Sequence, residues 1–500
     1  MAVASDARLD WDAFSYDVPW PCADGCHQYY LFNDYGAHVD HDRTFTHVHD
    51  DQEILDYNYA SLKSEILRAP NLTYKDFVFR VWTDNIVDQM IIGTNEYGHE
   101  HSYDDYEEIE LDDVGRCRMR LVIATYILQK EHNLSANELF QNKEHKAKFL
   151  TNHMSRKWWR SVRHNLCFNE WGYLINTDAH KCTDKFDYTL QELVKNSNSL
   201  IVMPKRSVLD ETRTVDNSRR SSFGTFIQNK PIKRGRTTDA VCCKLRTRNG
   251  HLLDGLSIAL NTYKGKKDNY DETLGTLLDP AKKEGKTDNK VHQIIKTEHE
   301  NDVLLPNAIV SLDKGYNSIN VLEKVLKHYG VKGVGPVSAR RKCLPKFFST
   351  ARFKKLKKKL RKGQYKQWYT RRGLHLTLFH DSKFVNMFDT CIDQDKLAVI
   401  QRRRKKKERK RSRRWRVNYT VPKVIEYYNK TMGSVDASNA RRKNHMIGNK
   451  HVRKHNRCYL GLFGQVVLQN PALMYGAYKG WKKVSQKPLL LAYDRIQQAD

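Results

Sequence analysis

The chain has 500 residues, enough for about two to four domains of ordinary size. Its net charge of +29 and its pI near 9.6 predict a polyanionic partner. Ten dispersed cysteines argue against a disulfide framework and are typical of a reduced intracellular protein. We expect no export signal and no membrane contact, because no run approaches the roughly 18 apolar residues that a membrane span requires.

Residues 1–54 are polar and weakly periodic, which predicts a poorly ordered N-terminus. They contain Cys22, Cys26 and His27, which are either a zinc site or isolated polar residues. The lack of a second cysteine pair favours the isolated polar residues.

The next part of the chain changes from a helical to a strand-like pattern. Between about 55 and 203 apolar residues recur at helical spacing, so we expect mainly helices. From 201 to 335 short apolar runs alternate with Gly, Asn and Asp, as at 251–260 and 309–312, and we expect strands there.

A helix is predicted directly after the run 309–312. Ser318 is suited to be its N-cap and Gly330 to end it. Residues 331–335 then follow as another strand. This strand–helix–strand order predicts an α/β core.

A basic window interrupts this core. Between Arg340 and Arg416 there are 29 Lys and Arg residues against 5 Asp and Glu residues, so the window holds +24 of the net charge. Its aromatic residues suit either stacking on nucleic acid or a small core of an inserted subdomain. The run 402–411 is typical of a nuclear import signal or a phosphate-binding stretch, although a solvated charged loop has the same composition. The nucleus is the expected location.

Three aspartates stand in contexts that suit metal-binding carboxylates. Asp210 follows a short apolar run, Asp313 ends the run 308–312, and Asp436 precedes a predicted helix. They are 103 and 123 residues apart, which is too far for a local metal loop and suits elements that meet only after folding. Two-metal phosphoryl chemistry requires such hard oxygen ligands from distant parts of a chain.

The sequence motifs around these aspartates resemble those of piggyBac-type transposases. Residues 204–211 (PKRSVLDE) are similar to the family's Asp-Glu segment, and 229–235 (NKPIKRG) to the phrase that follows it. Residues 313–318 (DKGYNS) resemble a second element at a strand end, and 428–436 (YNKTMGSVD) a third. The likeness runs from about 55 to 478 in the family's order.

The resemblance implies an α/β RNase H-like catalytic core with a basic insertion, flanked by a split, mainly helical dimerisation and DNA-binding domain. Carried over, the helical parts are 55–203 and 439–490. The core is 204–335 and 420–438, with the insertion at 336–419 between them.

The resemblance also implies a chemistry: metal-dependent DNA strand cleavage and transfer at TTAA sites. Asp210, Asp313 and Asp436 would be catalytic residues that hold two Mg²⁺ ions, with Mn²⁺ as a possible substitute. The partners would be double-stranded DNA, as transposon ends and TTAA target, and a second copy of the chain in a homodimer. DNA-binding candidates come from the basic residues near the core and in the insertion, whose alternative is a solvated surface. They are Lys230, Lys233, Arg234, Arg236, Lys357, Lys358, Lys359, Arg402, Arg403, Arg404, Lys405, Lys406 and Lys407.

Three departures from the family's pattern bear on activity. Asn439 stands where the family usually has a fourth acidic residue, on the helical face of Asp436, and it is a weak metal-ligand candidate through its carbonyl oxygen. Lys314 places a cation beside Asp313. The family's cysteine-rich zinc module has no counterpart, since Cys458 is the only cysteine after residue 400. The alternative function is a domesticated or decayed nuclear DNA-binding protein without catalysis.

Overall fold

The chain divides into two compact units. Unit 1 comprises Met1–Asp56 and Thr276–Met432, and unit 2 comprises Tyr57–Gly275 and Gly433–Asp500. The computed structural model describes residues 20–21, 29–30, 59–101, 106–131, 134–141, 148–168, 184–215, 225–228, 232–262, 286–338, 351–369, 374–390, 397–408, 411–445 and 456–484. Within these ranges no helix has the length and apolar character that crossing a membrane requires.

The first part of unit 2 is mainly helical, as its apolar spacing predicts. Helix α3 shows the local reason: Thr73 and Asp76 form a capping box at its start, and Tyr74, Phe77 and Val81 bury one face. The helices are α2 (Ser64–Arg68), α3 (Tyr74–Val81), α4 (Asp84–His101), α5 (Asp113–Glu131), α6 (Ala136–Gln141), α7 (Lys148–His153), α8 (Arg156–Asn165) and α10 (Asp184–Ser199).

The sheet of unit 2 is built around strand β7. It pairs antiparallel with β5, β6 and β8, and parallel with β3, which in turn pairs with β4. Residues 238–243 of β7 are buried without interruption, which marks it as the central strand. The strands are β3 (Ala60–Leu62), β4 (Ile201–Val202), β5 (Arg206–Val215), β6 (Thr225–Phe226), β7 (Arg234–Arg246) and β8 (Leu252–Thr262).

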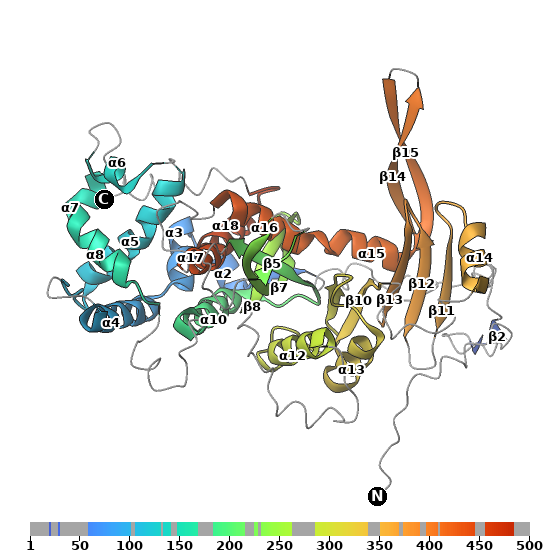
Figure 1. Cartoon of the computed structure of the whole chain (residues 1–500), viewed down its shortest axis with the longest axis horizontal. Helices are drawn as coiled ribbons and strands as arrows, with labels where there is room; N and C mark the ends of the chain where they lie inside the picture. The colour runs from blue at the N-terminus through green and yellow to red at the C-terminus, as the bar shows by residue number, and fades with distance from the viewer. Residues whose placement is uncertain are drawn as a thin grey trace, which may run out of the picture. The chain divides into compact units, whose positions relative to one another are not determined.

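The C-terminal helices of unit 2 pack on its N-terminal part. They are α16 (Gly433–His445), α17 (Asn456–Gly464), the π-helix η4 (Gln465–Gln469) and α18 (Asn470–Tyr478). The Tyr478 hydroxyl donates to the Ala69 carbonyl at 2.8 Å, and the Tyr74 hydroxyl donates to that of Leu468 at 3.1 Å. Figure 1 shows α18 in red beside α3 in blue, so the two ends of unit 2 share one core.

Unit 1 begins its described core with a strand–helix–strand motif. Helix α12 (Lys286–Glu300) precedes β9 (Ile309–Leu312), α13 (Ile319–Tyr329) and β10 (Lys332–Pro336), and β9 and β10 pair in parallel. The predicted caps of α13 are confirmed. The Ser318 hydroxyl accepts from the Val321 N–H at 3.2 Å, and Gly330 ends the helix in the left-handed conformation at φ 64°.

The rest of unit 1 is a sheet with a separate hairpin. Strands β10, β13, β12 and β11 pair antiparallel in that order, and β14 and β15 form a two-stranded sheet. The elements are α14 (Ala351–Lys359), β11 (Tyr365–Tyr369), β12 (His375–His380), β13 (Phe384–Asp389), β14 (Leu397–Glu408), β15 (Arg411–Pro422) and α15 (Lys423–Thr431). A short ladder, β1 (Trp20–Pro21) with β2 (Tyr29–Tyr30), lies among residues 1–54.

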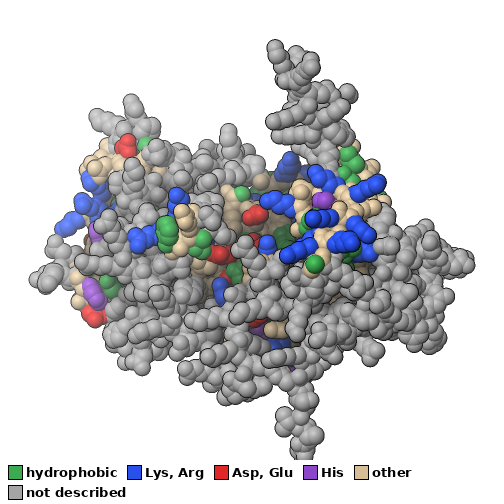
Figure 2. Space-filling view, turned by 45° about the vertical axis from the view of Figure 1, so that its right-hand side comes forward, with side chains coloured by type: hydrophobic (Ala, Val, Ile, Leu, Met, Phe, Trp, Pro, Cys, Tyr) green, Lys and Arg blue, Asp and Glu red, His purple; other side chains and the backbone are tan. Residues whose placement is uncertain are grey.

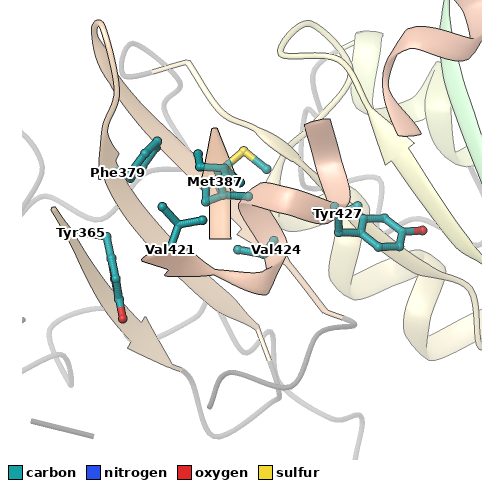
Figure 3. Packing of buried hydrophobic residues seen from close by; sticks show 9 residues of the cluster. Tyr365, Phe379, Met387, Val421, Val424 and Tyr427 are labelled. Carbon is teal, nitrogen blue, oxygen red and sulfur yellow. The ribbon is translucent and has the colours of Figure 1, made fainter. Parts of the chain in front are cut away.

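One hydrophobic cluster holds β10 to β15 and α15 of unit 1 together, as Figure 3 shows. Tyr365 and Trp368 of the basic window are buried, and so is Phe353, which favours the small-core interpretation of these aromatics. The members of the cluster are Val334, Tyr365, Phe379, Met387, Ile400, Val421, Val424, Ile425 and Tyr427.

Candidate active site

Helix α16, which carries Asp436, lies closely against strand β8. Gly255 has φ +85°, and a Cβ there would meet Ser438 N and Arg441 Nη1 at 2.7 Å. The Ser434 hydroxyl donates to the Asp254 carboxylate, and Arg441 donates to the Asp254 carbonyl. Gly255 lies at a β-bulge of β8, where a glycine lets the helix backbone approach the sheet.

The other side of α16 contacts strand β5. Asn439 Oδ1 accepts from the Thr212 hydroxyl and, at 3.2 Å, from Arg442 Nη2. Arg442 Nη2 also donates to the Arg213 carbonyl at 2.6 Å. Arg442 is 3% exposed, so these charge-assisted hydrogen bonds join α16 to β5 inside the unit.

These contacts show which face of α16 packs on β5. From Asn439 to Arg442 along the helix, the point of contact moves from Thr212 to Arg213 along the strand. The preceding turn of the helix carries Asp436, and Asp210 lies two residues before Thr212 on the strand. Alternate strand residues share a face, as do helix residues three apart, so both carboxylates are placed on the surfaces where α16 and β5 meet.

The two carboxylates differ in their exposure to solvent. Asp210 is half-buried on β5, and its Oδ1 accepts the Glu211 N–H at 2.6 Å. Asp436 is exposed in the first turn of α16, where a negative charge is favoured by the helix dipole. Glu211, which follows Asp210, is instead held by Arg213 Nη1 at 3.2 Å and by the Thr237 hydroxyl at 3.3 Å.

Asp313 belongs to unit 1, where it directly follows β9. Its carbonyl accepts the N–H groups of Tyr316 and Asn317, and Gly315 N–H donates to its carboxylate at 3.5 Å. Asn317 donates to the Gly335 carbonyl on β10, which fixes this turn to the parallel strand pair. Asp313 is half-buried and Lys314 is exposed.

The donor set fits a hard divalent cation in chemical type, since aspartate oxygens are ligands that Mg²⁺ and Mn²⁺ prefer. Asn439 does not fit as well, because its carbonyl oxygen already accepts hydrogen bonds from Thr212 and Arg442. Among the residues that the structure describes, no three His, Cys, Asp or Glu side chains form a group that could hold a metal ion. Cys22, Cys26 and His27 lie outside the described residues.

The DNA-binding candidates of unit 2 lie in different environments. Lys233 and Arg234 are exposed at the start of β7, and Lys230 lies outside the described residues. Arg236 is 5% exposed, and its Nη1 donates to the Tyr459 hydroxyl at 2.8 Å. Arg236 therefore joins β7 to α17. The basic residues around it in the sequence did not indicate this structural role.

The candidates of unit 1 likewise divide into half-buried and exposed cations. Lys357 lies over the Phe353 ring at 4.5 Å, and burial lowers its pKa, whereas Lys358 and Lys359 are exposed. Arg402 Nε donates to the Asp381 carboxylate at 3.0 Å. The backbones of residues 403–407 belong to β14, and their side chains lie outside the described part. Figure 2, which turns the part with β11 to β15 forward, shows Lys and Arg side chains gathered there.

A buried polar network below α16 was not found from the sequence. Gln465 Nε2 donates to Ser257 Oγ at 2.7 Å and to Ser438 Oγ at 2.9 Å, and Asn470 Nδ2 donates to the Ser257 carbonyl. These groups lock α16 and η4 onto β8. The only sequence signal is the pair of small residues Ser434 and Ser438, four apart on one face of α16.

The family model described as Transposase IS4 matches residues 79–471, a span that includes all three aspartates. The chain belongs to this transposase family. No curated protein matches the chain. Among solved structures, the chain is similar to a piggyBac transposase in a synaptic complex with hairpin DNA, with a TM-score of 0.63 and 14% identity over 87% of this chain and 81% of that one. The resemblance to piggyBac-type transposases is thus confirmed.

Proposed function

We propose that this chain cuts and joins DNA strands by two-metal chemistry at Asp210, Asp313 and Asp436. The observation that carries the proposal is the packing of α16, which bears Asp436, on β5, which bears Asp210. Membership of the transposase family supports it. Asp313 ends the buried strand β9 and would supply the third carboxylate.

The strand order within each unit supports an RNase H-like core. Unit 2 supplies three antiparallel strands in the order β8, β7, β5, and unit 1 supplies the parallel pair β9 and β10 joined by α13. In such a core the first carboxylate lies on the first strand, the second ends a central strand and the third is on a helix. Asp210, Asp313 and Asp436 occupy those three kinds of position.

The chemistry follows from the residue types. Two Mg²⁺ or Mn²⁺ ions bound by the aspartates would activate water or a DNA 3′-OH for attack on a phosphodiester and stabilise the leaving oxygen. The side chains of Asp210 and Asp436 reach solvent, so a DNA backbone has access to them. Thr212, Asn439 and Arg442 hold α16 in place and thereby position Asp436.

The substrate we propose is double-stranded DNA, with transposon ends as donor and TTAA as target. The similar solved structure is a transposase synaptic complex with hairpin DNA, which supports DNA as the partner. Because two DNA ends must be brought together, a homodimer is the simplest assembly. The basic run 402–411 supports a nuclear location.

Asp313→Asn tests the proposal. We expect it to abolish strand cleavage of a transposon-end duplex in Mg²⁺ or Mn²⁺ while duplex affinity in EDTA stays within about twofold, because phosphates are bound mainly by Lys and Arg. Asp302→Asn is the matched control, since Asp302 is an exposed carboxylate of the same unit, and it should cleave as the wild type does. Cleavage by Asp313→Asn would refute the assignment. A wild type that binds DNA but never cuts would indicate the alternative, a DNA-binding protein without catalysis.

A further inference from the structure

The hairpin β14–β15 is a long ribbon that is anchored at one end. Its antiparallel register runs without a break from Leu397↔Pro422 to Glu408↔Arg411. At about 3.3 Å per residue, its twelve-residue strands extend about 40 Å. Figure 1 shows β14 and β15 continuing past the ends of β11, β12 and β13.

The anchored end belongs to the core of unit 1. Ile400 and Val421 are buried in the hydrophobic cluster with residues of α15. The ion pair between Arg402 and Asp381 joins the ribbon to the turn after β12. Since this end is packed and paired, the direction in which the ribbon leaves the sheet is fixed by its first few residues.

The far half of the ribbon concentrates positive charge. Residues 402–416 contain twelve Lys or Arg residues and a single acid, Glu408. The register places like charges opposite each other in three pairs, which are Arg403↔Arg416, Lys405↔Arg414 and Lys406↔Arg413. Like charges at facing positions destabilise a pair of strands, and an isolated hairpin is only marginally stable in water. A polyanion lying along the ribbon would remove this repulsion.

The shape of the ribbon favours duplex DNA over duplex RNA as the polyanion that it binds. Two strands about 4.8 Å apart fit the major groove of B-form DNA, which is about 12 Å wide and admits a two-stranded ribbon. The deep, narrow major groove of an RNA duplex does not admit side chains. Alternate residues point to opposite sides of a strand, and basic residues occupy both sets of positions, so phosphates on both walls of the groove would have cationic partners.

We infer that β14–β15 is a DNA-binding arm whose far half, residues 403–408 and 411–416, lies in the major groove of duplex DNA. This inference rests on the proposed function, since it names the element that holds the DNA substrate. It does not depend on the three aspartates, and its test contains no metal ion.

The test compares two variants that lose the same charge. Lys405→Gln/Lys406→Gln/Arg413→Gln removes three charges from the ribbon, and Arg248→Gln/Lys482→Gln/Lys483→Gln removes three from exposed positions of unit 2. Affinity for a 30-base-pair duplex is measured in EDTA over a range of salt concentrations. We expect the ribbon variant alone to lower the slope of log K against log salt by about 2.7, as three lost phosphate contacts require.

Dimethyl sulfate footprinting identifies the groove. The wild type should protect guanine N7 in the major groove and leave adenine N3 in the minor groove reactive, and the ribbon variant should lose the protection. A shortened ribbon, in which Asn-Gly replaces residues 404–415 and the pair Arg403↔Arg416 is kept, should lose it too. The shortened ribbon lacks most of the facing like charges, so its two strands should pair at least as stably as in the wild type. Loss of protection in both variants would therefore not be explained by misfolding of the ribbon.

Three results would overturn the inference: equal effects of the two charge variants, protection that persists in the shortened ribbon, or equal wild-type affinity for an RNA duplex. If the ribbon variants bind the duplex with wild-type affinity and salt dependence, only the ribbon assignment is wrong. If the wild type binds no duplex at all, both the ribbon inference and the proposed function are contradicted.

Discussion

Asn439 and Thr212, 227 residues apart in sequence, are joined by a hydrogen bond from the Thr212 hydroxyl to the Asn439 carbonyl oxygen. The same oxygen accepts from the buried Arg442. Position 439 therefore joins α16 to β5, although it shares a helical face with Asp436.

Asn439→Asp should stabilise unit 2 without changing its use of metal. The carboxylate keeps both hydrogen bonds and turns the one from Arg442 into an ion pair, which should raise the free energy of unfolding by about 1 kcal/mol. The Mg²⁺ concentration for half-maximal strand cleavage should stay the same, as measured by titration with wild type in parallel. A large fall in that concentration would show that position 439 faces the metal after all.

Gly255→Ala should displace α16, whereas Gly250→Ala should not. Both glycines have positive φ, +85° and +75°, so each substitution carries the left-handed strain of about 1–2 kcal/mol. Only at Gly255 would the new Cβ meet α16, which adds about 1–3 kcal/mol of overpacking. Denaturant unfolding should rank the two variants in this order.

The comparison of the two glycines extends to activity. Because α16 carries Asp436, Gly255→Ala should slow strand cleavage and Gly250→Ala should leave it near wild type. Equal cleavage rates with unequal stabilities would mean that the position of α16 is not critical for the reaction.

The thiols of Cys242 and Cys243 should be protected from alkylation until unit 2 unfolds. Burial raises the pKa of Cys242 from 9.0 to about 12, and that of Cys243 also rises. Between pH 9 and 12 these thiols stay protonated in the folded state and ionise in the unfolded state. Their contribution to the free energy of unfolding is therefore intact below pH 9 and is lost as the pH rises toward 12. At pH 8.5 iodoacetamide should label the exposed Cys117 at once and Cys242 only at the rate of unfolding.

Peptide mapping by mass spectrometry measures this labelling site by site. Cys117→Ser should remove the fast phase at that peptide and leave the slow phase of Cys242 unchanged. Labelling of Cys242 as fast as that of Cys117 would show that the centre of β7 is open to solvent.

Met387→Ala should destabilise unit 1. Met387 is 1% exposed and contributes to the cluster that joins β13 to the root of the ribbon. Loss of a buried methionine side chain typically lowers the free energy of unfolding by about 2–5 kcal/mol. Amide hydrogen exchange of β12 and β13 should accelerate accordingly, with Val399→Ala, an exposed position of the ribbon, as the control.

Much of the fold could be predicted because its signals are local. Ser318 and Gly330 bound α13 by cap chemistry, which depends only on neighbouring residues. The apolar runs at 251–260 and 309–312 are strands because their length and composition favour them. Asp210, which follows a short apolar run, lies on β5, whereas Asp436, expected just before a helix, lies in the first turn of α16.

The rest depends on contacts between distant parts of the chain. Nothing near Asn439 indicates Thr212 as its partner, and nothing near Arg236 indicates that Tyr459 buries it. The strands of the ribbon were also missed, because a continuous run of Arg and Lys has no apolar alternation from which a strand can be predicted.

The divided sequence of unit 2 has a consequence for its synthesis. The 157 residues Thr276–Met432 lie between β8 and α16, so at about 5–20 residues per second the ribosome needs roughly 8–30 s to pass from one to the other. During that time the face of β8 that receives Ser434 and Ser438 has no helix to cover it. Nascent chains of this protein should therefore depend on chaperones for longer than those of a protein with a continuous domain. A messenger RNA truncated within this interval would encode a chain that lacks α16 to α18 and therefore cannot complete unit 2.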